Sequence, residues 1–215
     1  MTLNEIALKI AHTFNRHRDF YFVEKIKEDV VNIRATFIRR DDGKYVTSNE
    51  FVQELGCVPV IQASAMECCD KELGCDVLRT TLKVPKPLRR RSGLLFTYVG
   101  TKDRQNGFSL TDINMVEFQM HNRFTGGLPM YAYHNGYIYI FQPPSKSMDY
   151  VRVNGVFADP RDAEAFNECD GAGCYSDDDE FPVAEDMIEG IEMVILQKYG
   201  MQQPTNNEQV KVDEN

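Results

Sequence analysis

The chain has 215 residues, enough for one large domain with appendages, and its hydrophobic fraction of 42% is ordinary for a globular protein. No apolar run approaches the roughly 20 residues of a membrane span, and the N-terminus lacks the pattern of a signal peptide. We therefore expect an intracellular site of synthesis, where the six cysteines are thiols rather than a disulfide framework.

The net charge of −9 conceals two segments of opposite charge. The stretch between Lys83 and Arg104 is rich in lysine and arginine, whereas residues 159–192 are dominated by aspartate and glutamate. Such segments suit head-to-tail packing of identical subunits, because a heterologous interface joins two different patches. The alternative is two solvated surfaces that never meet.

The N-terminal region is predicted to be helical. Apolar residues recur at the α-helical period over residues 3–16 and 19–40, which predicts a helical hairpin. Thr47 and Glu50 have capping-box spacing and predict a short third helix through Leu55.

The middle of the chain favours β-structure. Runs typical of strands occur at residues 57–62, 77–84, 94–99, 130–133, 137–141 and 150–157. Asn135-Gly136 suits a type I′ turn, so the strands on either side of it are expected to form a hairpin. A helix over residues 110–122 is expected between these strands, with Ser109 and Thr111 as candidate caps.

The C-terminal region combines an acidic linker with an amphipathic helix. Asp159-Pro160 predicts the start of a short helix to about Glu168. The later helix carries one apolar stripe: Met187, Ile188, Ile191, Val194, Ile195 and Tyr199. This stripe either packs on the N-terminal hairpin of its own chain or docks on a partner.

The predicted fold class is α+β, with an N-terminal helical hairpin, a central antiparallel β-sheet or small barrel, and a C-terminal helix with a flexible tail. We expect one folding unit in four segments: helical residues 1–56, β-rich residues 57–158, the acidic linker and helix at 159–200, and the tail at 201–215.

Motifs for catalysis and metal binding are missing from the sequence. Cys68, Cys75, Cys169 and Cys174 could supply four ligands, but no zinc-site spacing requires it. The sequence has no H-E-x-x-H, nucleophile elbow or P-loop, and its acidic run lacks the ligand pattern of an EF-hand. We therefore expect no enzyme, cofactor or metal.

The basic run Arg89-Arg90-Arg91 could contact a phosphate backbone. The alternative is a turn between strands whose arginines pair with acids on this subunit or the next. No aromatic-interleaved basic stripe or helix-turn-helix supports base readout, so we expect only non-specific proximity to DNA.

Several phrases along the chain together resemble one family: MTLNEIALKI, NIRATFIRRD, FVQELGCVPV, LLFTYVGTKDRQNGFSLTD, FTGGLPMYAYHNGYIYIF and YVRVNGVFADPRD. They resemble virion structural proteins of crAss-like and related short-tailed phages of gut Bacteroidetes, over roughly residues 1–200. The resemblance implies a head–tail connector, a ring of twelve copies that links the portal to the tail and lines or surrounds the DNA channel. A lower tail ring, stopper or tail-tube protein is an alternative, as is a small zinc- or nucleic-acid-binding protein.

The resemblance turns the charged segments and the apolar stripe into candidate contact sites. Candidates for the subunit interface are Lys86, Arg89, Arg90, Arg91, Asp177, Asp178, Asp179 and Glu180. The stripe of the C-terminal helix is the candidate site for docking the portal or another partner. The implied location is the head–tail interface of the virion, after synthesis in the host cytoplasm and without a membrane partner.

Overall fold

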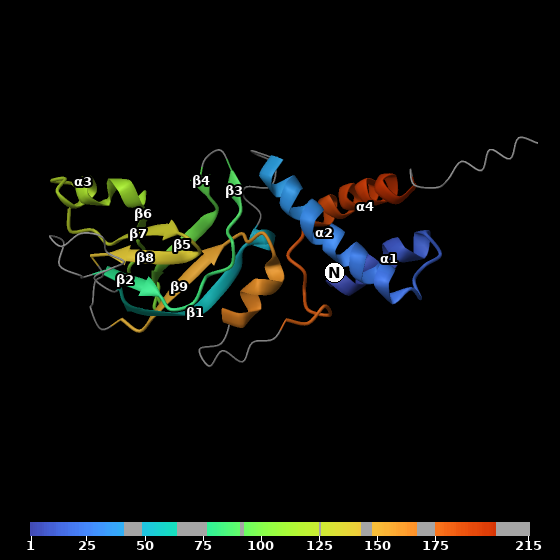
Figure 1. Cartoon of the computed structure of the whole chain (residues 1–215), viewed down its shortest axis with the longest axis horizontal. Coiled ribbons are helices and arrows are strands. Elements are labelled where there is room, and N and C mark those ends of the chain that lie inside the picture. The colour runs from blue at the N-terminus through green and yellow to red at the C-terminus, as the bar shows by residue number, and fades with distance from the viewer. Residues whose placement is uncertain are drawn as a thin grey trace, which may run out of the picture.

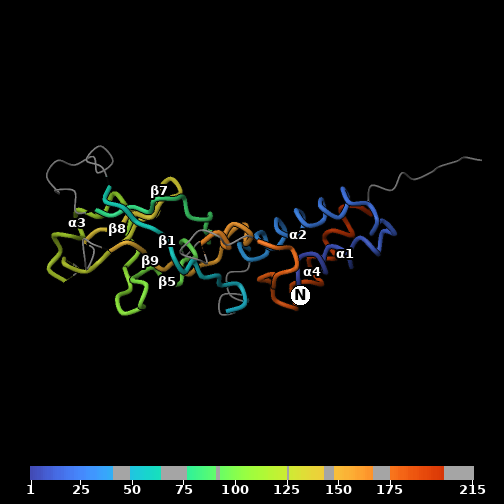
Figure 2. The backbone as a smooth tube through the Cα atoms, turned by 90° about the horizontal axis from the view of Figure 1, so that it is seen from below, coloured from blue at the N-terminus to red at the C-terminus, as the bar shows by residue number. Residues whose placement is uncertain are grey.

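The computed structural model describes residues 1–40, 49–63, 77–90, 93–124, 126–142, 148–166 and 175–200. Its helices and strands separate into a helical half and a β half along the longest axis of the molecule (Figure 1). The view from below in Figure 2 shows the same division, with the N-terminus and α4 both in the helical half. The α+β class expected from the sequence is confirmed.

The helical half contains α1 (Leu3–Thr13), α2 (Phe20–Arg40) and α4 (Glu185–Gly200). The start of α1 is a complete capping box: the Thr2 hydroxyl accepts from the backbone N–H of Glu5 at 3.1 Å, and the Glu5 carboxylate accepts from the backbone N–H of Thr2 at 2.9 Å. Helix α1 ends before the expected residue 16, because Asn15 takes a left-handed conformation with φ of 58°.

One hydrophobic core joins the three helices. Its fully buried members include Leu3, Ile6, Ile10, Ile26, Val30, Ile191 and Ile195, which come from all three helices. Because α4 supplies part of this core, it is an integral element of the helical half and not an appended arm.

The connection from α2 to the sheet differs from the prediction. A short 3₁₀ helix, η1 (Asn49–Phe51), leads directly into β1 (Gln53–Gln62), so the helix expected through Leu55 is wrong. Leu55 is fully buried and pairs with Val153 in the sheet, and this long-range pairing overrides the local capping signal.

A seven-stranded sheet forms the β half, with the order β5-β9-β1-β2-β8-β7-β6. Its other strands are β2 (Val77–Thr80), β5 (Phe96–Thr101), β6 (Ser109–Leu110), β7 (Met130–His134), β8 (Tyr137–Phe141) and β9 (Tyr150–Gly155). All pairs of strands are antiparallel except β6–β7.

The sheet curls almost into a barrel. The backbone N–H of Phe108 donates to the carbonyl of Val99 at 2.7 Å, which brings the segment before β6 back to β5. Across the interior, the ring of Phe96 lies 5.9 and 5.7 Å from the rings of Tyr131 and Tyr133, centroid to centroid. This arrangement confirms the antiparallel sheet or small barrel expected for the middle of the chain.

The β7–β8 hairpin and the start of the short helix at Pro160 follow the prediction. Asn135 and Gly136 have φ of 52° and 90°, as a type I′ turn requires. The Asp159 carboxylate accepts from the backbone N–H of Arg161 at 3.0 Å and caps η3 (Pro160–Phe166), which is a 3₁₀ helix.

The expected helix over residues 110–122 is divided and shorter. It consists of η2 (Ile113–Met115) and α3 (Val116–Met120), and Asp112 caps η2, not Ser109 or Thr111. Leu110 belongs to β6, which removes the first residues from the helix. The tail at 201–215 lies outside the described residues. Within the described ranges, no helix has the length and apolarity needed to cross a bilayer.

Two buried arginines tie the halves together. Arg34 of α2 is fully buried; its Nε donates to the carbonyl of Pro182 at 2.5 Å and its guanidinium donates to the carbonyl of Phe157 at 3.2 Å. Arg90 lies in a small second sheet of β3 (Arg89–Arg90) and β4 (Gly93–Leu94) and donates to the carbonyl of Ile38 at 2.8 Å. These bonds fix α2 against the β half.

Candidate functional site

The structure separates the members of the predicted basic cluster. Lys86 and Arg89 are exposed, whereas Arg90 is only 7% exposed and holds β3 to α2. Arg91 lies outside the described residues. In the structure, Arg90 therefore supports the fold of its own chain, and only Lys86 and Arg89 remain accessible among the described members of this cluster.

These two cations line a groove on the β half, together with Lys83. The groove, called the basic groove below, has a volume of about 1040 Å³. Among the lining residues that the structure describes, Asp112 is the one acid, and its carboxylate caps η2 by accepting from the backbone N–H of Asn114 at 2.9 Å. The groove therefore has a net positive lining.

Apolar side chains share the basic groove with the cations. Leu110, Ile113 and Met115 line it and are 47%, 39% and 48% exposed. Exposed aromatic residues continue along the chain at Phe118 and Phe124. A surface that joins exposed apolar groups to cations has the composition of an interaction site.

Two acids of the predicted acidic cluster are held by α1 and α2 of their own chain. Asp177 pairs with Lys27 at 2.6 Å, and Asp178 accepts from the side-chain amide of Asn4 at 3.2 Å. Burial alone would lower the pKa of Lys27, but Asp177 and Glu24 outweigh burial and raise it. The ion pair therefore fixes this loop against α2.

The two remaining acids of the cluster are exposed. The Asp179 carboxylate accepts from the backbone N–H of Ser176 at 3.0 Å and closes a local turn, while Glu180 forms an isolated β-bridge with Thr2. Of the four predicted acids, Asp178, Asp179 and Glu180 are exposed.

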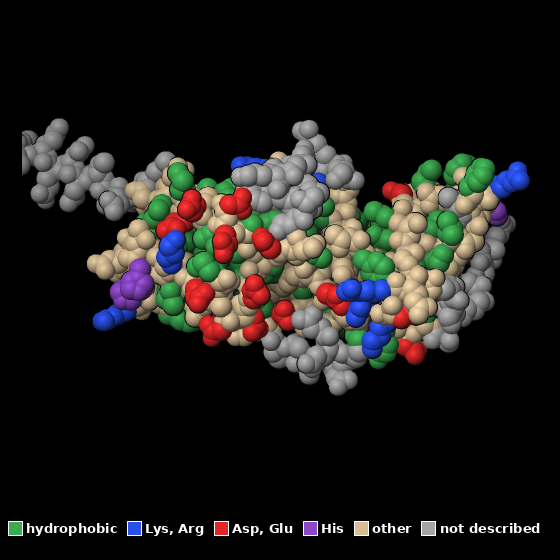
Figure 3. Space-filling model, turned by 180° about the vertical axis from the view of Figure 1, so that it is seen from behind, with side chains coloured by type: hydrophobic (Ala, Val, Ile, Leu, Met, Phe, Trp, Pro, Cys, Tyr) green, Lys and Arg blue, Asp and Glu red, His purple; other side chains and the backbone are tan. Residues whose placement is uncertain are grey.

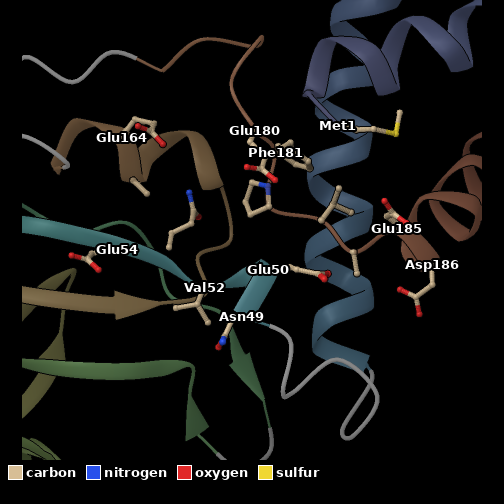
Figure 4. A pocket seen from close by; sticks show the side chains of 15 residues that line it. Met1, Asn49, Glu50, Val52, Glu54, Glu164, Glu180, Phe181, Glu185 and Asp186 are labelled. Carbon is tan, nitrogen blue, oxygen red and sulfur yellow. The ribbon is translucent and has the colours of Figure 1, made fainter.

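An acidic cleft of about 780 Å³ lies where the two halves meet (Figure 4). The acids that line it are Glu50, Glu54, Glu164, Glu180, Glu185 and Asp186. No lysine or arginine is among its lining residues in the described part of the chain. Figure 3 shows acidic side chains gathered over the helical half, so the cleft continues a wider negative surface.

The charge of the acidic cleft is not uniform. Glu54 pairs with Arg104 at 2.6 Å and with Arg152 at 3.0 Å, which neutralises the part of the cleft nearest the sheet. In contrast, Glu185 forms no ion pair with any described residue, and it lies on the first turn of α4. The charge of Glu185 therefore adds to the negative potential at the α4 side of the cleft.

The apolar stripe of α4 faces its own chain. Met187, Ile191 and Ile195 are buried in the core that α4 shares with the helical hairpin, and Ile188 is buried as well. Of the two alternatives left open by the sequence, the structure shows packing on the same chain, so a partner would have to displace α1 and α2 to reach the stripe.

Two other residues of the predicted docking stripe, Val194 and Tyr199, differ from the rest. The Tyr199 hydroxyl donates to the Asp29 carboxylate at 2.7 Å, and burial together with this carboxylate raises the pKa of Tyr199. Val194 is 37% exposed at the border of the stripe. Tyr199 therefore anchors the end of α4 to α2.

The outward face of α4 was missed by the sequence analysis. Glu185, Glu189 and Met193 follow one another at i, i+4 and i+8, and all three are exposed. Their helical spacing is visible in the sequence, but the apolar stripe on the opposite face concealed its meaning. This outward face is acidic at the start and apolar one turn later.

The residues that the structure describes do not form a metal centre. Within them, no group of three His, Cys, Asp or Glu side chains is positioned to hold a metal ion. Cys57 of β1 is buried and disulfide-bonded, so the expectation of free thiols is wrong for this residue. Disulfide formation requires two sulfurs close in space, which spacing along the chain does not reveal. The other five cysteines lie outside the described residues.

Comparison with known families decides the class of protein. The family model described as phage tail ring protein 2, a crAss-phage ring family, matches residues 4–215. The chain belongs to this family of phage tail ring proteins. As a phage tail ring protein it is a structural component of the virion, and it contacts copies of itself and other phage proteins. No curated protein matches this ring protein.

Proposed function

We propose that this phage tail ring protein forms a closed ring in the head–tail connector, linking the portal to the tail and surrounding the DNA channel. Membership of a tail ring family supports the ring. The separation of basic and acidic surfaces within one chain supports assembly of that ring from head-to-tail contacts. The basic groove lies on the β half, whereas the acidic cleft lies where the two halves meet and the acidic outward face of α4 belongs to the helical half.

This segregation suits a heterologous interface. Two different patches on each subunit pair head to tail, and the chain of subunits closes when the rotation between neighbours divides a full turn. Lys86 and Arg89 of one subunit then face acids of the next. Twelve copies would match the symmetry of the portal that the resemblance implies.

The net charge of −9 suits a protein that surrounds DNA without holding it. Specific and non-specific DNA binding both depend on cations that neutralise phosphates. If the cations of the basic groove are engaged by a neighbouring subunit, the assembled ring presents little positive charge to the genome. The proposed ring therefore surrounds the DNA without binding it tightly.

Tests of portal binding and of ring assembly need variants that leave the fold of the single chain intact. Truncation after Phe181 would remove α4 and expose the core of the helical half, so lost binding would report unfolding. Charge reversal of the basic run Arg89-Arg90-Arg91 would include Arg90, which is buried, so lost assembly could also report unfolding. Variants of exposed residues are needed instead.

The direct test mixes the intact protein with its purified portal and measures the mass of the complex by light scattering. We expect one complex whose added mass corresponds to a full ring of copies. A mixture in which the protein stays monomeric and does not elute with the portal would contradict the proposed function.

A further inference from the structure

We infer that the outward face of α4 in one subunit docks into the basic groove of a second copy of the chain. This inference rests on the proposed function and specifies the interface that builds the ring. The face consists of Glu185, Glu189 and Met193, and the groove presents Lys86 and Arg89 beside apolar residues.

Shape favours α4 as the occupant of the basic groove. The acidic cleft and the basic groove are both concave, so they cannot fill one another. Helix α4 is convex, and Glu185 at its start also lines the acidic cleft. A helix that lays one face into a groove is a common mode of protein recognition.

The charged and apolar residues on the outward face of α4 match those that line the basic groove. The carboxylates of Glu185 and Glu189 suit the ammonium of Lys86 and the guanidinium of Arg89, and neither cation forms an ion pair with a described residue. Met193 is 61% exposed and suits the apolar lining of the groove. Within the described part of the chain, both sides of the contact are therefore open to a partner.

The occupant must come from another copy. Figures 1 and 2 both place α4 in the helical half and α3, beside the basic groove, at the far end of the β half. The buried bonds of Arg34 and Arg90 fix the halves, so one chain cannot bend to fill its own groove. Repetition between copies gives the head-to-tail contact of a ring.

A charge-swap experiment tests this pairing. The basic variant is K86E/R89E, the acidic variant is E185K/E189K, and the fourfold variant combines all four substitutions. The matched control for the basic variant is R18E/R123E, which makes the same charge change as K86E/R89E at two exposed arginines outside the groove. Self-association is measured by analytical ultracentrifugation, and folding is verified by circular dichroism.

We expect each double variant to weaken self-association by at least about tenfold, because like charges then meet at the interface. Fourfold reversal restores complementary charges and should restore self-association, and so should mixing the two double variants. The pairing would be overturned if either double variant self-associated as strongly as the control variant. It would also be overturned if the fourfold variant did not recover self-association.

Portal binding is measured separately on the same variants. If K86E/R89E loses the portal but self-associates normally, the groove serves the portal and this inference fails while the proposed function stands. If the wild type never binds the portal but the charge swap controls self-association, the proposed function fails and the pairing stands.

Discussion

Arg34 is the residue at which the two halves of the molecule converge. It is fully buried and donates to carbonyls of the segment before α4 and of the β half. Burial lowers its pKa to about 9, with the charge of Asp159 opposing the shift. A cation in this position costs desolvation energy, which its hydrogen bonds to two separate segments offset.

Replacement of Arg34 by alanine should destabilise the protein by about 2–4 kcal/mol, because it leaves a cavity and two unsatisfied carbonyls. The matched control is Arg39→Ala in the exposed last turn of α2, with a change below about 0.5 kcal/mol. Urea unfolding measures both. Equal stability of the two variants would show that Arg34 does not join the halves.

A second residue-scale prediction concerns Asp159 and the loss of stability at low pH. Burial alone would raise the pKa of Asp159, but the hydrogen bonds and charge of Arg161 outweigh it and lower the pKa below 3.8. The stability from Asp159 is therefore present above pH 3.8 and is lost as the pH falls through the lower folded value.

We expect Asp159→Asn to cost about 1–2 kcal/mol at pH 7, because the asparagine keeps the oxygen that caps η3 but loses the charge that pairs with Arg161, and to cost less at pH 3. Asp162→Asn is the contrasting control, because burial raises the pKa of Asp162 and reverses the sign. Urea midpoints at both pH values measure the difference, and a cost for Asp159→Asn that does not change with pH would contradict the assignment.

At the scale of elements, the sequence predicts the features that depend on residues close together along the chain. The capping box of Thr2 and Glu5, the turn at Asn135-Gly136 and the amphipathic pattern of α4 each depend on neighbouring residues, and each is present in the structure.

Features that depend on distant residues were missed or mistaken. Leu55 joins a strand because of its partner in β9, and Arg90 is buried because α2 offers a carbonyl. The acids near Asp177 are engaged by the N-terminus, which no spacing predicts. For the same reason, the sequence indicated the two charged regions but not which of their residues remain exposed.

The two faces of α4 should respond differently to substitution. Ile191→Ala removes a fully buried side chain and should lower the free energy of unfolding by about 2–4 kcal/mol. Met193→Ala lies on the outward face and should change stability by less than about 0.5 kcal/mol while weakening self-association. Thermal unfolding and sedimentation measure the two effects. If Met193→Ala lowered stability and Ile191→Ala did not, our assignment of Ile191 to the buried face and Met193 to the outward face would be wrong.

At the scale of the whole molecule, the protein is a two-part body with a basic groove on its β half and an acidic outward face on α4 of its helical half. The buried arginines hold the parts in one arrangement, and that arrangement sets the angle between the outward face of α4 and the basic groove. In a head-to-tail assembly this angle fixes the rotation from one subunit to the next, and thus the number of copies in a closed ring.

The most direct test of this account is a cryo-electron microscopy reconstruction of the protein bound to its portal. We predict a closed ring coaxial with the portal, in which Glu185 and Glu189 of each subunit face Lys86 and Arg89 of the next. A ring built on isologous contacts, or single copies scattered on the portal, would contradict the account.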